Sequence, residues 1–169
     1  RDYAYLGNPY PTLTGGFSNT FQYKNFSLYI RADFTTGQTI YNYAKLFADG
    51  QYQGDALPTA DYISKMWKKQ GDIASQPRYL WQDSQGNFLP SSLFYKKGDF
   101  LALREITLSY SLPDKILKRI KLKSLRFNLT GQNLHYFTGY AGPNPEEGGT
   151  DNGHYPIPIN LIFGVRVSL

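Results

Sequence analysis

The most constraining feature of this chain is the alternation of residue types over its C-terminal segment, IPINLIFGVRVSL. Every odd-numbered residue from Ile157 to Leu169 is apolar, and the positions between them include Asn160, Gly164, Arg166 and Ser168. Successive side chains of a β-strand point to opposite faces of a sheet. The alternation therefore predicts a long strand over 157–169 with one fully apolar face.

Four more segments show the same alternation, over 16–24, 26–35, 99–111 and 124–136. In 99–111 the apolar phase changes between Leu103 and Ile106, which predicts a β-bulge near Arg104-Glu105. A strand of 10–13 residues reaches roughly 33–43 Å, whereas globular strands average about 5–6 residues. A bilayer crossing needs about 9–11. Residues 37–97 lack sustained alternation and are expected to form one long loop with a short helix in TADYISKMWKKQGD.

Composition supports an all-β fold, because 15 Tyr, 11 Phe, 16 Gly and 10 Pro favour strands and turns. The absence of Cys excludes disulfides and thiolate metal sites. The sequence has no run of about 18 apolar residues, the length that would predict a membrane-spanning helix.

Two environments fit the alternating strands. Either the apolar faces meet lipid and the polar faces a wet lumen, or the chain is a secreted or surface β-sandwich that binds glycan.

The ordered segments NFSLYIRADFTTGQTIYN, GDFLALREITLSYSLPDKIL, SLRFNLTGQNLHYFTGYAGPNPE and YPIPINLIFGVRVSL resemble the C-terminal end of SusC/RagA-type TonB-dependent outer-membrane transporters. The resemblance implies that residues 1–169 are antiparallel strands in the C-terminal part of a transmembrane barrel of about 22 strands. Residues 37–97 and 137–156 would then be extracellular loops. Lys24-Asn25 and 112–122 would be periplasmic turns.

The same resemblance implies a place in the outer membrane of a Gram-negative bacterium and the import of oligosaccharides or peptides. Expected partners are outer-membrane lipid, the rest of the barrel and its plug, a SusD-like surface lipoprotein, and the TonB complex, reached through a plug outside these residues. A barrel-assembly signal of the form polar-x-Gly-x-x-apolar-x-aromatic is matched at Gly164 and Val167. It is not matched at Ile162 or Leu169, although Leu169 occupies its last position.

Catalytic and nucleic-acid functions find little support. The chain has two histidines, His135 and His154, and neither a G-x-S-x-G motif nor a P-loop. Adjacent loop carboxylates such as Glu146-Glu147 rarely face each other across a glycosidic bond. The basic run in 115–123 lacks interleaved aromatic residues, so it is expected to be a solvated turn rather than a nucleic-acid site. No enzyme activity and no cofactor are expected. Glu146, Glu147, Asp151 and Asn152 carry oxygen ligands of the kind that calcium prefers, and a calcium site there is the alternative to a solvated acidic loop.

Exposed aromatic residues in or next to the two long loops are the candidate contacts for a ligand or a partner protein. They are Trp67, Tyr79, Trp81, Tyr136, Tyr140 and Tyr155. The alternative is that these rings hold the loops together or belong to an aromatic girdle.

Arg104, Arg126 and Arg166 are expected to face the lumen, because a charge at the lipid midplane costs about 2–4 kcal/mol. There they would either contact the plug or be hydrated.

Overall fold

The computed structural model describes residues 4–49, 58–80 and 91–169. The chain divides into two compact units. One unit, the sheet unit, comprises residues 11–37, 99–139 and 156–169, and the other, the loop unit, comprises residues 1–10, 38–98 and 140–155. Among the described residues, no helix has the length and apolar character needed to cross a membrane.

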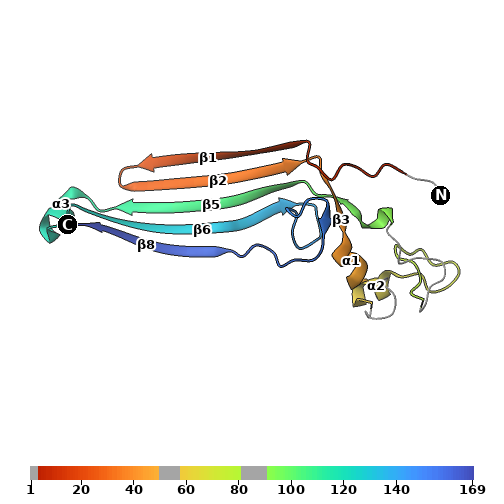
Figure 1. Ribbon diagram of the computed structural model, residues 1–169. Coiled ribbons are helices and arrows are strands. Elements are labelled where there is room, and N and C mark those ends of the chain that lie inside the picture. Colours follow the sequence, from red (N-terminus) through yellow and green to blue (C-terminus); the bar gives the residue numbers. More distant parts are fainter. Residues whose placement is uncertain (1–3, 50–57, 81–90) are drawn as a thin grey trace. The chain divides into compact units, whose positions relative to one another are not determined.

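Five long strands build the sheet unit (Figure 1). They are β1 (Leu13–Tyr23), β2 (Phe26–Thr36), β5 (Phe100–Ser111), β6 (Ser124–Thr138) and β8 (Asn160–Ser168). Their order in the sheet is β1-β2-β5-β6-β8, and every neighbouring pair is antiparallel. Each strand overlaps one of the five ranges expected from alternation, although β1 begins three residues earlier and β6 ends two residues later than expected. β8 begins at Asn160 rather than at 157, since Pro156 and Pro158 have no N–H to donate to a ladder.

One face of this sheet is apolar from edge to edge. Residues directly opposite each other in antiparallel strands share a face, so the register defines rows that cross all five strands. One row comprises Tyr23, Phe26, Tyr110, Phe127 and Val165, and the next comprises Phe21, Leu28, Leu108, Leu129 and Phe163. These side chains are not covered by another layer among the described residues. Phe163, for example, is 68% exposed. A closed β-sandwich, the alternative interpretation of the alternation, is therefore not formed by the described residues.

All Asp, Glu, Lys and Arg residues of the five strands lie on the opposite, polar face. They are Arg31, Asp33, Arg104, Glu105, Arg126 and Arg166. The remaining positions on this face are mainly Ser, Thr, Asn, Gln and Gly. The sheet thus has two chemically distinct sides: one carries all the Asp, Glu, Lys and Arg side chains of the strands, and the other has none of them and only His135 as a basic side chain.

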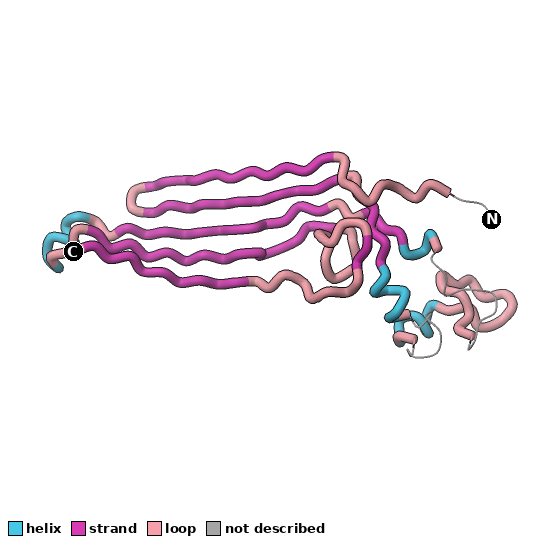
Figure 2. Tube along the Cα trace, viewed as in Figure 1, coloured by secondary structure: helices cyan, strands magenta, loops and turns pink. Residues whose placement is uncertain are grey.

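The connections differ sharply at the two ends of the sheet. At one end, Lys24 (φ 52°) and Asn25 join β1 to β2, and a segment containing α3 (Asp114–Ile120) joins β5 to β6. At the other end, the connections run from β2 to β5 and from β6 to β8, and they contain much of the loop unit. Figure 2 shows the long strands with the α3 connection at one end. Short connections therefore share one end and long ones the other.

The predicted long loop over 37–97 is wrong as a description of the loop unit. Among its described residues, the unit contains a second, three-stranded sheet in the order β4-β3-β7 and three short helices. These elements are β3 (Thr39–Asn42), α1 (Tyr43–Ala48), α2 (Ala60–Lys65), the 3-10 helix η1 (Ser92–Phe94), β4 (Tyr95–Lys97) and β7 (Thr150–Asp151). The expected helix in 59–72 is limited to α2. The unit has its own small core of Ile40, Leu46, Tyr62 and Phe94, and such a core is built by contacts distant in sequence.

Candidate functional site

A bulge in β5 gives the polar face its most highly charged region. Arg31 pairs with Glu105, but the next residue, Ala32, pairs with Leu103, so Arg104 is the extra residue on β5. Arg104 and Glu105 consequently both lie on the polar face, which reverses the apolar phase of the strand. The bulge predicted near Arg104-Glu105 is confirmed. On the neighbouring strand β6, Asn133 (φ 52°) and Leu134 take up the same irregularity.

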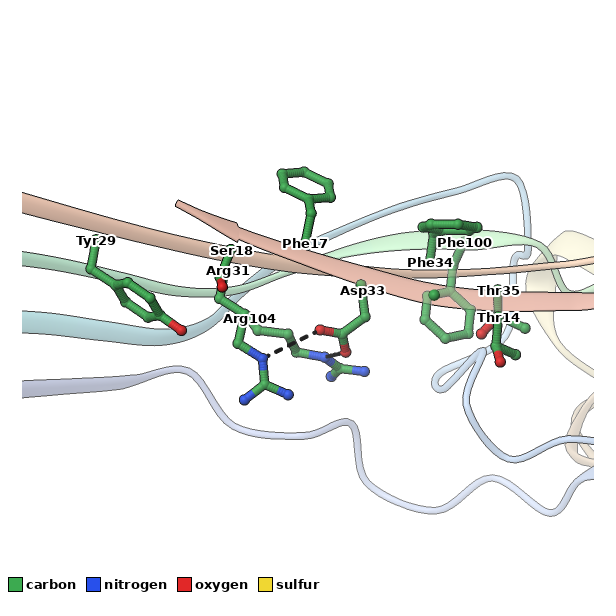
Figure 3. A pocket seen from close by; sticks show the side chains of 12 residues that line it. Thr14, Phe17, Ser18, Tyr29, Arg31, Asp33, Phe34, Thr35, Phe100 and Arg104 are labelled. Carbon is green, nitrogen blue, oxygen red and sulfur yellow. Dashed lines mark hydrogen bonds and ion pairs between the residues drawn. The ribbon is translucent and has the colours of Figure 1, made fainter. Parts of the chain in front are cut away.

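Asp33 lies between two guanidinium groups on this face (Figure 3). Arg104 Nε donates a hydrogen bond to Asp33 Oδ2, and Arg31 Nε is 3.7 Å from Asp33 Oδ1. Arg104 Nη1 also donates to the Tyr136 hydroxyl (2.9 Å), and its guanidinium carbon is 5.6 Å from the Tyr136 ring centroid. With Glu105, which is directly opposite Arg31, the region carries two positively and two negatively charged side chains.

A cavity of about 590 Å³ adjoins this cluster. Polar groups from β1 and β2, including Thr14, Ser18 and Tyr29, line it together with the charged cluster and Phe100. Phe100 is buried and makes an edge-to-face contact with Tyr136, with ring centroids 5.8 Å apart. The site therefore combines an aromatic side chain with charged groups of both signs, which suits a polar ligand more than an apolar one.

Farther along the polar face, hydroxyl and amide side chains bridge β5 and β6. Thr107 donates to Glu105 Oε1 and lies 2.8 Å from the Thr130 hydroxyl oxygen, and Ser109 donates to Asn128 Oδ1. Arg126 donates to the Ser111 hydroxyl and is directly opposite Arg166 on β8. All three arginines predicted to face the lumen are thus on the polar face.

A second buried polar pair lies in the loop unit. The Tyr140 hydroxyl donates to Asp151 Oδ2 (2.6 Å), and the backbone N–H of Gly153 donates to Asp151 Oδ1 (2.8 Å). Both side chains are buried. Burial, together with the hydrogen bond to Asp151 and its negative charge, raises the pKa of Tyr140 well above its ordinary value. Tyr140 was expected to be an exposed contact residue. Instead it is buried, and its hydrogen bond fixes the loop after β6.

The other aromatic candidates are scattered. Tyr136 belongs to the charged cluster on β6, whereas Tyr155 is 97% exposed and Trp67 and Tyr79 are only partly exposed. Trp81 lies outside the described residues. The role of these residues in ligand or partner contact stays a prediction.

Two groups of residues were missed by the sequence analysis. Arg31 and Asp33 alternate with Ile30, Ala32 and Phe34, so the period of two already placed them on the polar face. The second group is an aromatic cluster in the loop unit, with ring centroids 4.9–6.3 Å apart, formed by Tyr41, Tyr43, Phe47, Phe94 and Tyr95. No local sequence pattern predicts this cluster, because its residues come from separate elements, β3, α1, η1 and β4, that meet only in the folded unit.

In the acidic loop after β6, the Glu147 carboxylate interacts with other groups of the same loop. Glu147 Oε2 accepts from the Asn152 N–H, and Glu147 Oε1 is 2.7 Å from His154 Nδ1. In the described part of the chain, no three His, Cys, Asp or Glu residues are placed to hold a metal ion. The geometry therefore lends no support to the calcium hypothesis.

The barrel-assembly signal at the end of β8 stays a prediction. Val167 and Leu169 are exposed, and Gly164 pairs with Asn128 on the polar face.

Comparison with known proteins finds relatives among the TonB-dependent receptors. No protein-family model matches the chain. TonB-dependent receptor P39 of Formosa agariphila is 30% identical over 176 residues, covering 99% of this chain and 17% of that protein. TonB-dependent receptor P3 of the same organism is 29% identical over 179 residues, covering 98% of this chain and 17% of that protein. This chain is homologous to TonB-dependent receptors. It spans about one sixth of the length of these relatives.

Solved structures agree at the level of fold. The RagAB peptide importer in its open-open state matches with a TM-score of 0.72 and 22% identity, over 95% of this chain and 17% of that one. The closed-closed state gives a TM-score of 0.71 and 23% identity, over 95% and 18% of the two chains. The predicted resemblance to SusC/RagA-type TonB-dependent transporters is thereby confirmed. The all-β, antiparallel fold is confirmed as well, although the described residues do not close a barrel.

Proposed function

We propose that the sheet unit is part of the barrel wall of a TonB-dependent outer-membrane transporter in a Gram-negative bacterium. The apolar face contacts lipid, and the polar face lines the lumen. One observation carries this proposal: every Asp, Glu, Lys and Arg side chain of the five strands lies on one face, while the other face is mainly apolar and exposed. In water such a face would be an aggregation hazard, whereas lipid accepts it without cost.

The edges of the sheet support the same proposal. β1 and β8 each have a neighbour on one side only among the described residues. Strands as long as these, with unpaired edges, are uncommon in soluble proteins because they template aggregation. In a closed barrel, further strands pair with both edges. The remaining strands and the plug would come from the part of the receptor outside this chain, consistent with the span of about one sixth of its relatives.

The asymmetric connections support an orientation. Outer-membrane barrels have short periplasmic turns and longer extracellular loops. By this rule, the end with Lys24-Asn25 and α3 is periplasmic. The loop unit belongs to the extracellular side, where its aromatic residues are available to cargo or to a SusD-like lipoprotein. TonB would act through the plug.

The cargo in this proposal is an oligosaccharide or a peptide. The similarity in fold to the RagAB peptide importer favours the peptide alternative. The charged, aromatic cavity beside Asp33 is compatible with either cargo. The calcium hypothesis is not part of the proposal.

Fractionation and growth experiments test this function. The full-length receptor, produced in a Gram-negative host, should sediment with the outer membrane and require detergent for extraction. A deletion strain of the source bacterium should lose growth on either short peptides or an oligosaccharide as the sole carbon source. A receptor that remains monodisperse in detergent-free buffer would falsify the membrane-wall proposal.

A further inference from the structure

The basic segment between β5 and β6 has a defined structure rather than that of a loose turn. The N–H groups of Ile116 and Leu117 donate to the Pro113 carbonyl (2.9 and 3.1 Å) and start α3. Lys121, in the left-handed region (φ 56°), ends the helix, and the Leu122 N–H donates back to the Leu117 carbonyl. Leu117 is the buried residue of the helix. The segment is therefore held in one conformation by backbone bonds and a single apolar anchor.

Five cations project from this segment. All are exposed, and none has an ion-pair partner among the described residues: Lys115, Lys118, Arg119, Lys121 and Lys123. Asp114 is the only acidic residue between Leu112 and Lys123, so the segment has a net charge of +4 from five cations and one anion. A surface with this charge attracts anions.

Two isoleucines are exposed beside these cations. Ile116 and Ile120 are 45% and 47% exposed. Residues four apart lie on the same side of a helix, so the two side chains form one small apolar patch. In a turn surrounded only by water, exposing two isoleucine side chains would be unfavourable. Apolar side chains next to several Lys and Arg are instead the signature of a helix lying at a lipid interface.

The place of α3 in the fold matches that signature. Tyr110 belongs to the apolar-face row that contains Tyr23 and Phe26, and Asp114 follows it four residues later. Tyrosine side chains are enriched at the level of lipid headgroups. If the apolar face lies in hydrocarbon, α3 begins just beyond that face, at the depth of the headgroups. This step depends on the proposed function.

We propose that α3 and the cations around it bind the headgroups of anionic phospholipids in the periplasmic leaflet. The ammonium and guanidinium groups would neutralise the phosphodiesters, and Ile116 and Ile120 would rest against the first acyl carbons. Nucleic acid and a soluble acidic protein are alternative sources of negative charge. Neither would use the apolar patch or the adjacent lipid-facing sheet.

Native mass spectrometry of the full-length receptor, titrated with phosphatidylglycerol or phosphatidylethanolamine of identical acyl chains, tests the proposal. The receptor should bind phosphatidylglycerol more tightly. The triple variant Lys115→Gln, Lys118→Gln, Arg119→Gln should weaken phosphatidylglycerol binding by roughly tenfold or more, since each surface cation adds substantially to the attraction. Phosphatidylethanolamine binding should change little. The variant Ile116→Ser, Ile120→Ser should weaken the binding of both lipids.

A matched variant removes three exposed cations from the loop unit, Lys68→Gln, Lys69→Gln, Lys96→Gln, and should leave the preference unchanged. A further test uses the unaltered receptor alone: raising the salt concentration should reduce its preference for phosphatidylglycerol over phosphatidylethanolamine. Equal binding of the two lipids by the unaltered receptor, or an equal loss in both triple variants, would overturn the proposal. So would a cation-dependent preference for an anionic peptide or oligonucleotide over the lipid. A receptor that needs no detergent would instead refute the membrane-wall function, which is a separate result.

Discussion

Arg104 on β5 binds Asp33 on β2, although the residue directly opposite Asp33 is Ala102. The bulge makes this contact geometrically available, because it adds Arg104 to the polar face between Leu103 and Glu105. The same arginine reaches Tyr136 on β6. One bulged residue therefore ties three adjacent strands together through side chains as well as through the ladder.

The Arg104–Asp33 contact should be energetically coupled. In a double-mutant cycle with Arg104→Gln and Asp33→Asn, we expect a coupling free energy of about 1–2 kcal/mol, because both side chains are largely shielded from water and the hydrogen bond is charged. Urea unfolding of the full-length receptor in lipid vesicles measures it. Arg31 is the internal control. Its side chain is 56% exposed and 3.7 Å from Asp33, so its coupling should stay below about 1 kcal/mol. Equal couplings for the two arginines would contradict the assignment.

Much of the sheet was predictable because its information is local. Alternation identified each long strand, and the change of phase between Leu103 and Ile106 located the bulge. A two-residue period leaves only two possible faces, so the placement of Arg126 and Arg166 followed as well. Arg31 and Asp33 were as predictable as these arginines, but they become a site only through the neighbouring β5, which the local pattern does not identify.

The loop unit was not predictable in the same way. β3 is four residues long and pairs with β4 and β7, which are far away in the sequence. Short strands show too few alternations to be recognised. Tyr140 sits in a polar, Gly- and Pro-rich segment that suggests exposure, yet Asp151 offers it an acceptor eleven residues later. Burial here depends on a partner, not on local composition.

The two faces of β8 should respond oppositely to charge. Phe163 lies on the apolar face opposite Leu129, and its neighbour Ile162 lies on the polar face opposite Thr130. Phe163→Lys should lower the amount of folded receptor in the outer membrane, because a lysine facing lipid costs up to about 2–4 kcal/mol. Ile162→Lys should be tolerated. Quantitative immunoblotting of outer-membrane fractions compares the two. Similar losses for both variants would argue against lipid contact on the Phe163 side.

Tyr140 should make stability depend on alkaline pH. Its raised pKa in the folded protein means that its contribution is fully present below the ordinary tyrosine pKa of about 10 and is lost as the pH rises above that value. At pH 8, Tyr140→Phe should therefore unfold at a lower temperature than the unaltered receptor. Between pH 9 and pH 11 this difference should shrink. The fully solvated Tyr155 provides the control, because Tyr155→Phe should leave the unfolding temperature unchanged across the range. A difference that stays constant with pH would refute the assignment to Tyr140.

Gly142 should be intolerant of any side chain. A Cβ atom at this position would overlap the Tyr140 ring and the Asp151 carboxylate. Neither group can move without breaking their buried hydrogen bond, so Gly142→Ala should destabilise the loop unit by about 1–3 kcal/mol. Gly139→Ala is the matched control, because a Cβ there meets nothing within 4 Å. Hydrogen exchange of residues 140–155 in the full-length receptor should accelerate in the first variant and not in the second. Since the five-stranded sheet is a separate unit, its exchange should be unaffected in both. Equal exchange in the two variants would mean that the Tyr140–Asp151 pair does not hold this loop.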